Sequence, residues 1–125
     1  MGTDGLVHVE LSREIIGAAM KVLNVLKPGL DEKAYENALV IELKKQGHRL
    51  DQQRRYTVRY EGVVVDTLVP DLIVDELVVV DPKVVDEFTS THVAKMIGYL
   101  TVTDLHLAIL LNFKHVDLRW RRIVR

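Results

Sequence analysis

The sequence has no cysteine among its 125 residues. A chain without thiols forms no disulfide, no zinc–thiolate site and no cysteine nucleophile, and its composition fits an intracellular protein. The first ten residues, MGTDGLVHVE, lack the basic start and the apolar core of a signal peptide. No apolar run approaches the roughly 20 residues that a membrane helix needs. We therefore expect a cytoplasmic protein that has no membrane partner.

The sequence also has almost no excess of charge of either sign. Its 17 Lys and Arg residues and 18 Asp and Glu residues leave a formal net charge of −1. A nucleic-acid partner would therefore have to be held by local basic patches. Apolar residues make up 48% of the chain and charged residues 28%, a balance typical of soluble globular proteins. The length suits one domain, which we expect to span residues 1–125.

The spacing of apolar residues predicts three helices. The first begins at Ser12 as the N-cap and stops before Pro28 and Gly29; the second runs from 31 to 46, and the third from 89 to about 103. The expected buried sides of the second and third helices consist of Tyr35, Leu39 and Leu43, and of Val93, Met96, Ile97 and Leu100.

Between the second and third helices the apolar period changes to two, which is typical of strands. RRYTVRY (54–60) alternates, a turn follows at 61–62, and VVVDTLVPDLIV (63–74) is expected to form one long strand. LVVV (77–80) predicts a short strand that is covered on both faces. LHLAILLNF (105–113) and LRWRRIVR (118–125) predict two more. This order predicts a mixed α/β fold around one sheet.

Three ionisable residues, Asp71, Asp81 and Lys83, interrupt the two apolar strands before the third helix. Alternation puts Asp81 and Lys83 on the same face of their strand. Whether Asp71 joins them depends on the hairpin loop. A two-residue loop at 75–76 would send Asp81 to the face away from Asp71, whereas a three-residue loop at 75–77 would set the two aspartates opposite each other.

In the second register the two carboxylates would lie roughly 5 Å apart at Cβ, where they repel unless they share a cation. Oxygen ligands of this kind suit Mg²⁺ or Mn²⁺. Lys83 could then orient an attacking water or help to deprotonate it. An aspartate and a lysine at this spacing more often lie on a solvated sheet edge, but here they interrupt strands that ought to be covered.

One further carboxylate, Glu32, falls on the buried side of the second helix, close to its start. A negative charge at this end gains from the helix dipole. An acidic residue in the first helical turn, at the rim of the core, is a common feature without any catalytic role. Glu32 alone therefore does not define a site.

Five blocks of the sequence follow one another in an order that resembles a known family. They are LSREIIGAAMKV (11–22), the trio Gly29, Glu32 and Tyr35, PDLIV (70–74), DPK (81–83) and HVAKMIGYL (92–100). Together they resemble the bacterial and archaeal family named for its motif GxxExxY, which is assigned to the PD-(D/E)xK nuclease superfamily. The resemblance extends from about Leu11 to Val124.

The resemblance implies a restriction-endonuclease-like αβββαβ core. It matches Glu32, Asp71 and Asp81 to the acidic metal ligands of the superfamily and Lys83 to its catalytic lysine. In this superfamily one or two magnesium ions activate water for phosphodiester hydrolysis. A magnesium-dependent nuclease is therefore the first expected function, with nucleic acid as the partner.

Two departures from the family pattern fall in the catalytic blocks. Pro82 lacks an N–H and cannot complete an interior ladder, so its strand should be an edge there or be bent. Lys95, spaced to pair with Tyr99, stands where related nucleases often carry glutamine, and it could bind phosphate or displace a metal. His92 matches a family position at the helix start, where a capping role is equally expected. We assign Lys95, Tyr99 and His92 as substrate-binding candidates.

The departures favour an alternative function, in which a nuclease fold without activity serves as a self-assembling or partner-binding module. The terminal strand, with Trp120 and a free edge, suits pairing of subunits into a homo-oligomer. Two strands also carry arginines that could follow a phosphate backbone, although such alternation more often marks a half-buried strand with one solvated face. These arginines are Arg49, Arg54, Arg55, Arg59, Arg119, Arg121, Arg122 and Arg125.

Overall fold

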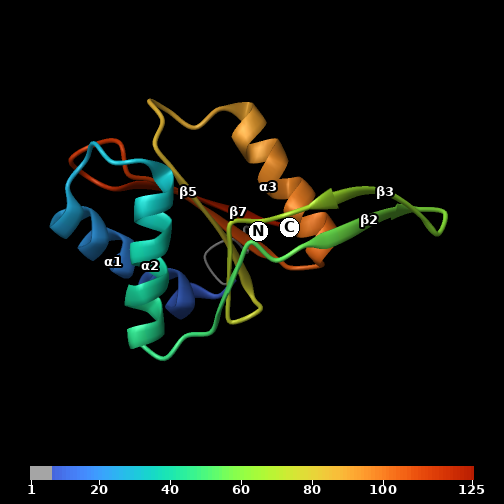
Figure 1. Ribbon diagram of the computed structural model, residues 1–125, viewed down its shortest axis with the longest axis horizontal. Helices are drawn as coiled ribbons and strands as arrows, with labels where there is room; N and C mark the ends of the chain where they lie inside the picture. The colour runs from blue at the N-terminus through green and yellow to red at the C-terminus, as the bar shows by residue number, and fades with distance from the viewer. Residues whose placement is uncertain (1–6) are drawn as a thin grey trace.

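The computed structural model describes residues 7–125, and its first two elements are the helices α1 (Val9–Leu26) and α2 (Glu32–Lys45), which cross and pack against each other (Figure 1). The prediction of Ser12 as the N-cap was wrong. The Ser12 N–H already donates to the His8 carbonyl at 2.8 Å, so the helix starts one turn earlier. The Ser12 side chain is instead buried within α1.

The turn between the two helices depends on Gly29 and Tyr35. Gly29 has φ +118°, a backbone conformation open to glycine and strained for other residues. The Tyr35 hydroxyl donates to the Lys27 carbonyl at 2.6 Å and accepts from the Leu30 N–H at 3.1 Å. The Tyr35 ring is fully buried and stacks on Phe113, with 4.7 Å between the ring centroids. One side chain thus joins the turn to the core.

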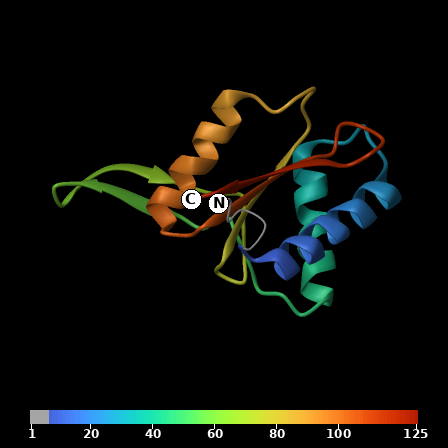
Figure 2. The ribbon, with the colours of Figure 1, turned by 180° about the vertical axis from the view of Figure 1, so that it is seen from behind.

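A five-stranded mixed sheet lies between the helices (Figures 1 and 2). Its central strands β5 (Val78–Lys83) and β6 (Leu107–Asn112) are parallel and are joined by the crossover helix α3 (Ser90–Thr103). Helices α1 and α2 pack on one face of the sheet and α3 packs on the other. The sheet order is β1-β4-β5-β6-β7, with β1 at Leu50–Gln52, β4 at Leu72–Val74 and β7 at Arg119–Val124.

This architecture confirms the predicted mixed α/β fold of the restriction-endonuclease type. The residues Val78, Val79 and Val80 are fully buried, as expected for a strand covered on both faces. On α3 the prediction of a buried Ile97 was wrong, because the helix packs through Met96, Tyr99 and Leu100 and leaves Ile97 on its flank, 48% exposed. Within residues 7–125, no helix combines the length and apolar character needed to cross a bilayer.

The long strand predicted over 63–74 is divided, which corrects the sequence interpretation. Its first part, β3 (Val63–Leu68), pairs with β2 (Tyr56–Tyr60) in a separate two-stranded arm that projects from the body beside α3 (Figure 1). The ladder stops before Pro70, which has no N–H to donate. The register nevertheless continues across the break, since Leu50 pairs with Val74 and Tyr56 with Leu68 in the same alignment.

The β4–β5 hairpin has the three-residue loop of the second predicted register, because Val74 pairs with Val78. Asp75 and Glu76 both adopt left-handed backbone conformations, at φ +53° and +57°. The Asp75 carboxylate accepts from the Arg49 N–H at 2.8 Å and lies 2.6 Å from His48 Nδ1. Contacts with a segment 26 or 27 residues away thus hold the loop that sets the register.

Candidate acidic site

Three side chains occupy neighbouring positions across adjacent strands, where β1 ends and β4 begins. The β4–β5 register sets Asp71 opposite Asp81, and the β1–β4 register sets Gln53 opposite Asp71. The second pairing is seen directly, because the Gln53 N–H donates to the Asp71 carbonyl at 3.0 Å. Side chains opposite each other in an antiparallel pair lie on the same face and interact. The register therefore brings together two of the predicted acidic residues.

The carboxylate of Asp81 is almost fully buried, with 2% of the residue exposed. Oδ2 lies 3.3 Å from the Lys83 ammonium, whereas Oδ1 makes no hydrogen bond within the described part of the chain. Burial and the neighbouring Asp71 carboxylate raise the pKa of Asp81 to about 7, and Lys83 opposes them only in part. Asp81 therefore carries a proton about half of the time near pH 7.

Lys83 lies among carboxylates. Burial lowers the pKa of Lys83, but Asp81, Glu32 and Asp71 together raise it above the ordinary value. The ammonium is therefore charged at neutral pH and can donate hydrogen bonds, but it is unsuited to act as a base. Of the two roles considered from the sequence, orienting a water fits this electrostatic setting better than deprotonating it.

Glu32 joins the site from the start of α2, in accord with its predicted position at the edge of the core. Its Oε2 accepts from the Val84 N–H at 3.1 Å, directly after Lys83 in the chain. The side chain is half-buried and lies on the Lys83 side of the site. Glu32 thus fixes the end of β5, and its charge helps to hold the ammonium.

Pro82 does not distort this arrangement, because β5 has a free edge at that point. The Lys83 carbonyl accepts from the Phe113 N–H at 2.9 Å, so the polar backbone groups of Lys83 face β6. By alternation those of Pro82 face the β4 side, where the last β4 pair is Leu72 with Val80. The missing N–H of Pro82 therefore costs no ladder bond. Of the two sequence alternatives, an edge or a bend, the structure has the edge.

Glu36 is a part of the site that the sequence interpretation missed. Only 4% of this residue is exposed, and its Oε2 accepts from Gln52 at 2.6 Å, Gln53 at 3.2 Å and Lys33 at 3.1 Å. A buried carboxylate with several charge-assisted bonds is a common feature of functional sites. The buried side of α2 is wider than the predicted one, because it includes Glu36 and Val40 as well as the expected residues. The helical spacing of Glu36 and Val40 was the feature of the sequence that could have indicated this.

The three substrate-binding candidates on α3 make contacts within or close to their own helix. His92 and Thr89 form a reciprocal capping box, with bonds of 3.0 and 3.2 Å. Lys95 Nζ lies 5.7 Å from the centre of the Tyr99 ring, which confirms the pairing expected from their spacing. Their role toward a substrate stays a prediction.

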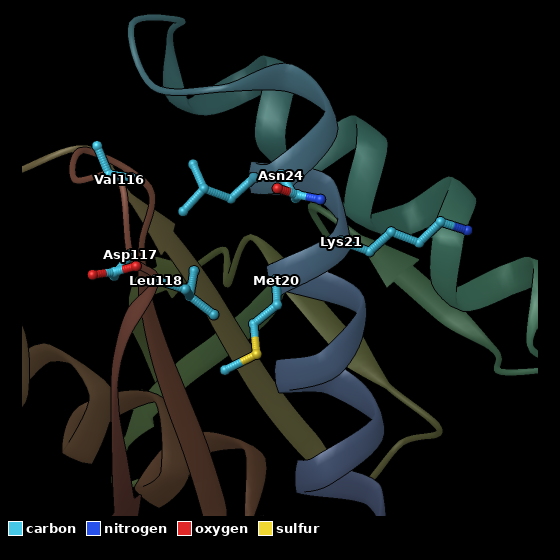
Figure 3. A pocket seen from close by; sticks show the side chains of 7 residues that line it. Met20, Lys21, Asn24, Val116, Asp117 and Leu118 are labelled. Atoms are coloured by element: carbon cyan, nitrogen blue, oxygen red, sulfur yellow. The ribbon is translucent and has the colours of Figure 1, made fainter.

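At least three of the predicted basic positions are engaged in ion pairs, and one of them is Arg125, which lies 2.5 Å from Asp104. Arg49 and Arg54 both reach Asp51 and Glu76, at 3.5–3.7 Å. These ion pairs neutralise some of the arginines that were considered as contacts for a phosphate backbone. A separate pocket lies between α1 and the turn that joins β6 to β7, as Figure 3 shows, and none of its lining residues belongs to the acidic site.

The donor atoms of the site suit a hard divalent cation. Asp71 and Asp81 supply adjacent carboxylates, and one buried oxygen of Asp81 has no hydrogen-bond partner in the described part of the chain. Among residues 7–125 no group of three His, Cys, Asp or Glu side chains is arranged to hold a metal. Two carboxylates nevertheless suffice for Mg²⁺, which usually keeps several water ligands. The residues present therefore fit such an ion. Glu32 lies farther away, on the Lys83 side of the site.

A mixed sheet between helices, with an acidic pair and a lysine at the end of its central strands, defines a restriction-endonuclease-like protein. The family model for the PD-(D/E)XK nuclease superfamily matches residues 9–123. The chain belongs to this superfamily. Comparisons with curated proteins and with solved structures found no significant match.

Proposed function

We propose that the protein is a metal-dependent phosphodiester hydrolase that acts on nucleic acid in the cytoplasm. The observation that carries the proposal is the Asp81 carboxylate, which is buried against Asp71 and paired with Lys83 through one oxygen. Its other oxygen has no hydrogen-bond partner among residues 7–125. Burying an ionisable carboxylate without a full set of partners lowers the stability of the fold, which is expected where a ligand supplies the missing interaction. Within the superfamily we place the chain in the GxxExxY family, because Gly29 and Tyr35 shape the turn that leads to Glu32.

Each residue has a distinct proposed role. Asp71 and Asp81 would hold the ion, Mg²⁺ or Mn²⁺, with Glu32 as a further candidate ligand. When bound, the ion acts as a Lewis acid that polarises the phosphate and activates a water. Lys83 keeps its proton, restrains Asp81 and directs hydrogen bonds to the attacking water or to the negative phosphate oxygens. Lys95 and Tyr99 are proposed to contact the substrate from α3.

The activity is tested by incubating the purified protein with duplex DNA, single-stranded DNA and RNA in the presence of Mg²⁺, Mn²⁺ or a chelator. We expect metal-dependent cleavage that falls at least about 100-fold in Lys83→Met, because a preorganised charge is lost at the reacting phosphate. Asp71→Asn should lose cleavage and metal binding together.

The control is Asp117→Asn, which removes an exposed carboxylate outside the site and should cleave like the wild type. Cleavage that survives in Asp71→Asn would point to a contaminating nuclease. A complete lack of cleavage with every substrate and metal would contradict the proposed activity.

We also propose that the protein forms a homo-oligomer through the arm formed by β2 and β3. Four large apolar residues of the arm are exposed, and a concentration of exposed apolar side chains of this kind marks protein contacts. These are Tyr60 at 67%, Val63 at 65%, Val64 at 49% and Val65 at 60%. Trp120 on β7, 44% exposed, adds a second apolar position.

Light scattering coupled to size exclusion tests the assembly. We expect a mass that is a multiple of 14.3 kDa for the wild type and the monomer mass for Val65→Asp, because a charge on the arm opposes apolar contact. Val116→Asp, at an even more exposed valine outside the arm, is the matched control and should assemble normally. A monomeric wild type at high concentration would exclude this assembly.

A further inference from the structure

Gln53 is held beside Asp71 by both its backbone and its side chain. Its N–H donates to the Asp71 carbonyl at 3.0 Å, and its Nε2 lies 3.2 Å from Asp71 Oδ1. The backbone of Gln53 is left-handed, with φ +59°. For a residue other than glycine this conformation is uncommon and mildly strained, and it persists where the surrounding contacts hold it. The strain turns the chain at the point where β1 ends and the arm begins.

The Gln53 amide joins two carboxylates. Besides Asp71 Oδ1, its Nε2 donates to Glu36 Oε2 at 3.2 Å. A carboxamide nitrogen has two hydrogens, and an ionised carboxylate only accepts. Both hydrogens are therefore used, one for each neighbour, and the amide has a single orientation that satisfies both.

Glu36 is anchored more firmly than a surface carboxylate. In addition to Gln53, its Oε2 accepts from Gln52, whose Nε2 also donates to Asn37 Oδ1 at 2.8 Å, and from Lys33. Lys33 and Glu36 lie on α2 one turn apart, so the carboxylate is fixed to a helix rather than to a loop. The line of contacts therefore runs from α2 through Glu36 and Gln53 to Asp71.

We infer that Gln53, anchored by Glu36, is the positioning residue that sets the orientation of the Asp71 carboxylate. Asp71 itself lies outside β4 and has no strand geometry to hold its side chain. Repulsion from Asp81 and attraction to Lys83 would both turn it. The Gln53 side-chain amide, through Nε2, fixes Oδ1 and leaves Oδ2 as the oxygen available to Asp81 or to an ion. The inference rests on the proposed function only where it concerns the ion.

The first test is structural and needs no metal. Crystal structures of the wild type and of Gln53→Met are compared, because methionine keeps the side-chain length and removes the donor. We expect the Asp71 carboxylate to rotate in Gln53→Met and to keep its place in the control Gln46→Met, an exposed glutamine at the end of α2. An Asp71 side chain that stays in place in Gln53→Met overturns the inference.

The second test measures Mn²⁺ affinity by calorimetry, together with thermal unfolding. Loss of a partner that orients a metal ligand typically weakens binding 10–100-fold. We expect a loss of about this size in Gln53→Met, with little change in unfolding temperature, because Gln53 is exposed. Unchanged affinity overturns the inference. If the wild type binds no Mn²⁺, the proposed function fails, while the crystal comparison still decides the role of Gln53.

The role of Glu36 is separated by a double-mutant cycle. If Glu36 acts through Gln53, Glu36→Met combined with Gln53→Met loses no more Mn²⁺ affinity than Gln53→Met alone. Losses that add would show that Glu36 acts on the site independently, and would overturn that half of the inference. Should Glu36→Met unfold, the crystal structure of Lys33→Met tests the same anchor, with a displaced Gln53 amide expected and an unmoved one contrary to it.

Discussion

Replacing Asp81 with asparagine is expected to stabilise the folded protein at pH 8 while it removes metal binding. In the unfolded chain Asp81 ionises near its ordinary pKa of 3.8, but in the folded protein burial and Asp71 raise the pKa to about 7. The folded state therefore holds the proton more tightly. Stability from this group is complete below pH 3.8 and is lost as the pH rises toward 7. Asparagine removes this loss, on the order of 4 kcal/mol at pH 8.

Chemical denaturation of the metal-free protein between pH 4 and pH 8 measures the effect. The wild type should lose stability across this range, and Asp81→Asn should lose clearly less. Asp117→Asn is the matched control, and its free energy of unfolding should stay within about 0.5 kcal/mol of the wild type. Equal slopes for the wild type and Asp81→Asn would contradict the predicted ionisation. A site residue that destabilises the resting fold is a recognised cost of function.

Replacing Tyr35 should cause the largest loss of stability, although Tyr35 belongs to the motif that suggested the nuclease family. Tyr35→Phe removes the hydroxyl that bonds Lys27 and Leu30, leaves two backbone groups unpaired and should cost about 1–3 kcal/mol. Tyr35→Ala also removes the fully buried ring stacked on Phe113 and should cost about 3–5 kcal/mol.

Urea titration of both variants gives these values directly. Tyr60→Phe is the control for the hydroxyl, because Tyr60 is 67% exposed and should tolerate the change. If Tyr35→Phe unfolds like the wild type, the hydroxyl does not hold the turn before Glu32. The tyrosine of the motif then has a packing role only.

The parts of the fold that the sequence predicted well are those that depend on local periodicity. The two buried valine and leucine strands, the limits of α2 and the buried Tyr35 follow from spacing alone. The start of α1 was misplaced because Ser12 has the chemistry of a cap but lies inside an apolar periodic segment. The division of the long strand was missed although Pro70 was visible, because alternation on both sides of it is compatible with one strand.

The candidate site depended on information that is not local. The period of a strand leaves two registers open for Asp71 and Asp81, and the choice is made by Asp75 through its contacts with His48 and Arg49. His48 and Arg49 lie 26 or 27 residues before Asp75, so the sequence around the hairpin does not reveal these contacts. Gln53 and Glu36 were missed for the same reason, since their function as partners appears only when α2 and the end of β1 are placed together.

The unbroken register of the arm limits how the length of this protein can vary. Gln53 and Asp71 lie in the same register as Tyr56 and Leu68. Adding or removing one residue on a single strand between the acidic site and these positions would therefore rotate one side chain of the site out of place. Matched changes on both strands would leave it intact. The bulge between Val58 and Arg59 already absorbs one odd residue beyond the site. The outer part of the arm is therefore free to vary in sequence and length. The inner part must keep its number of residues, because that number sets the register at the site.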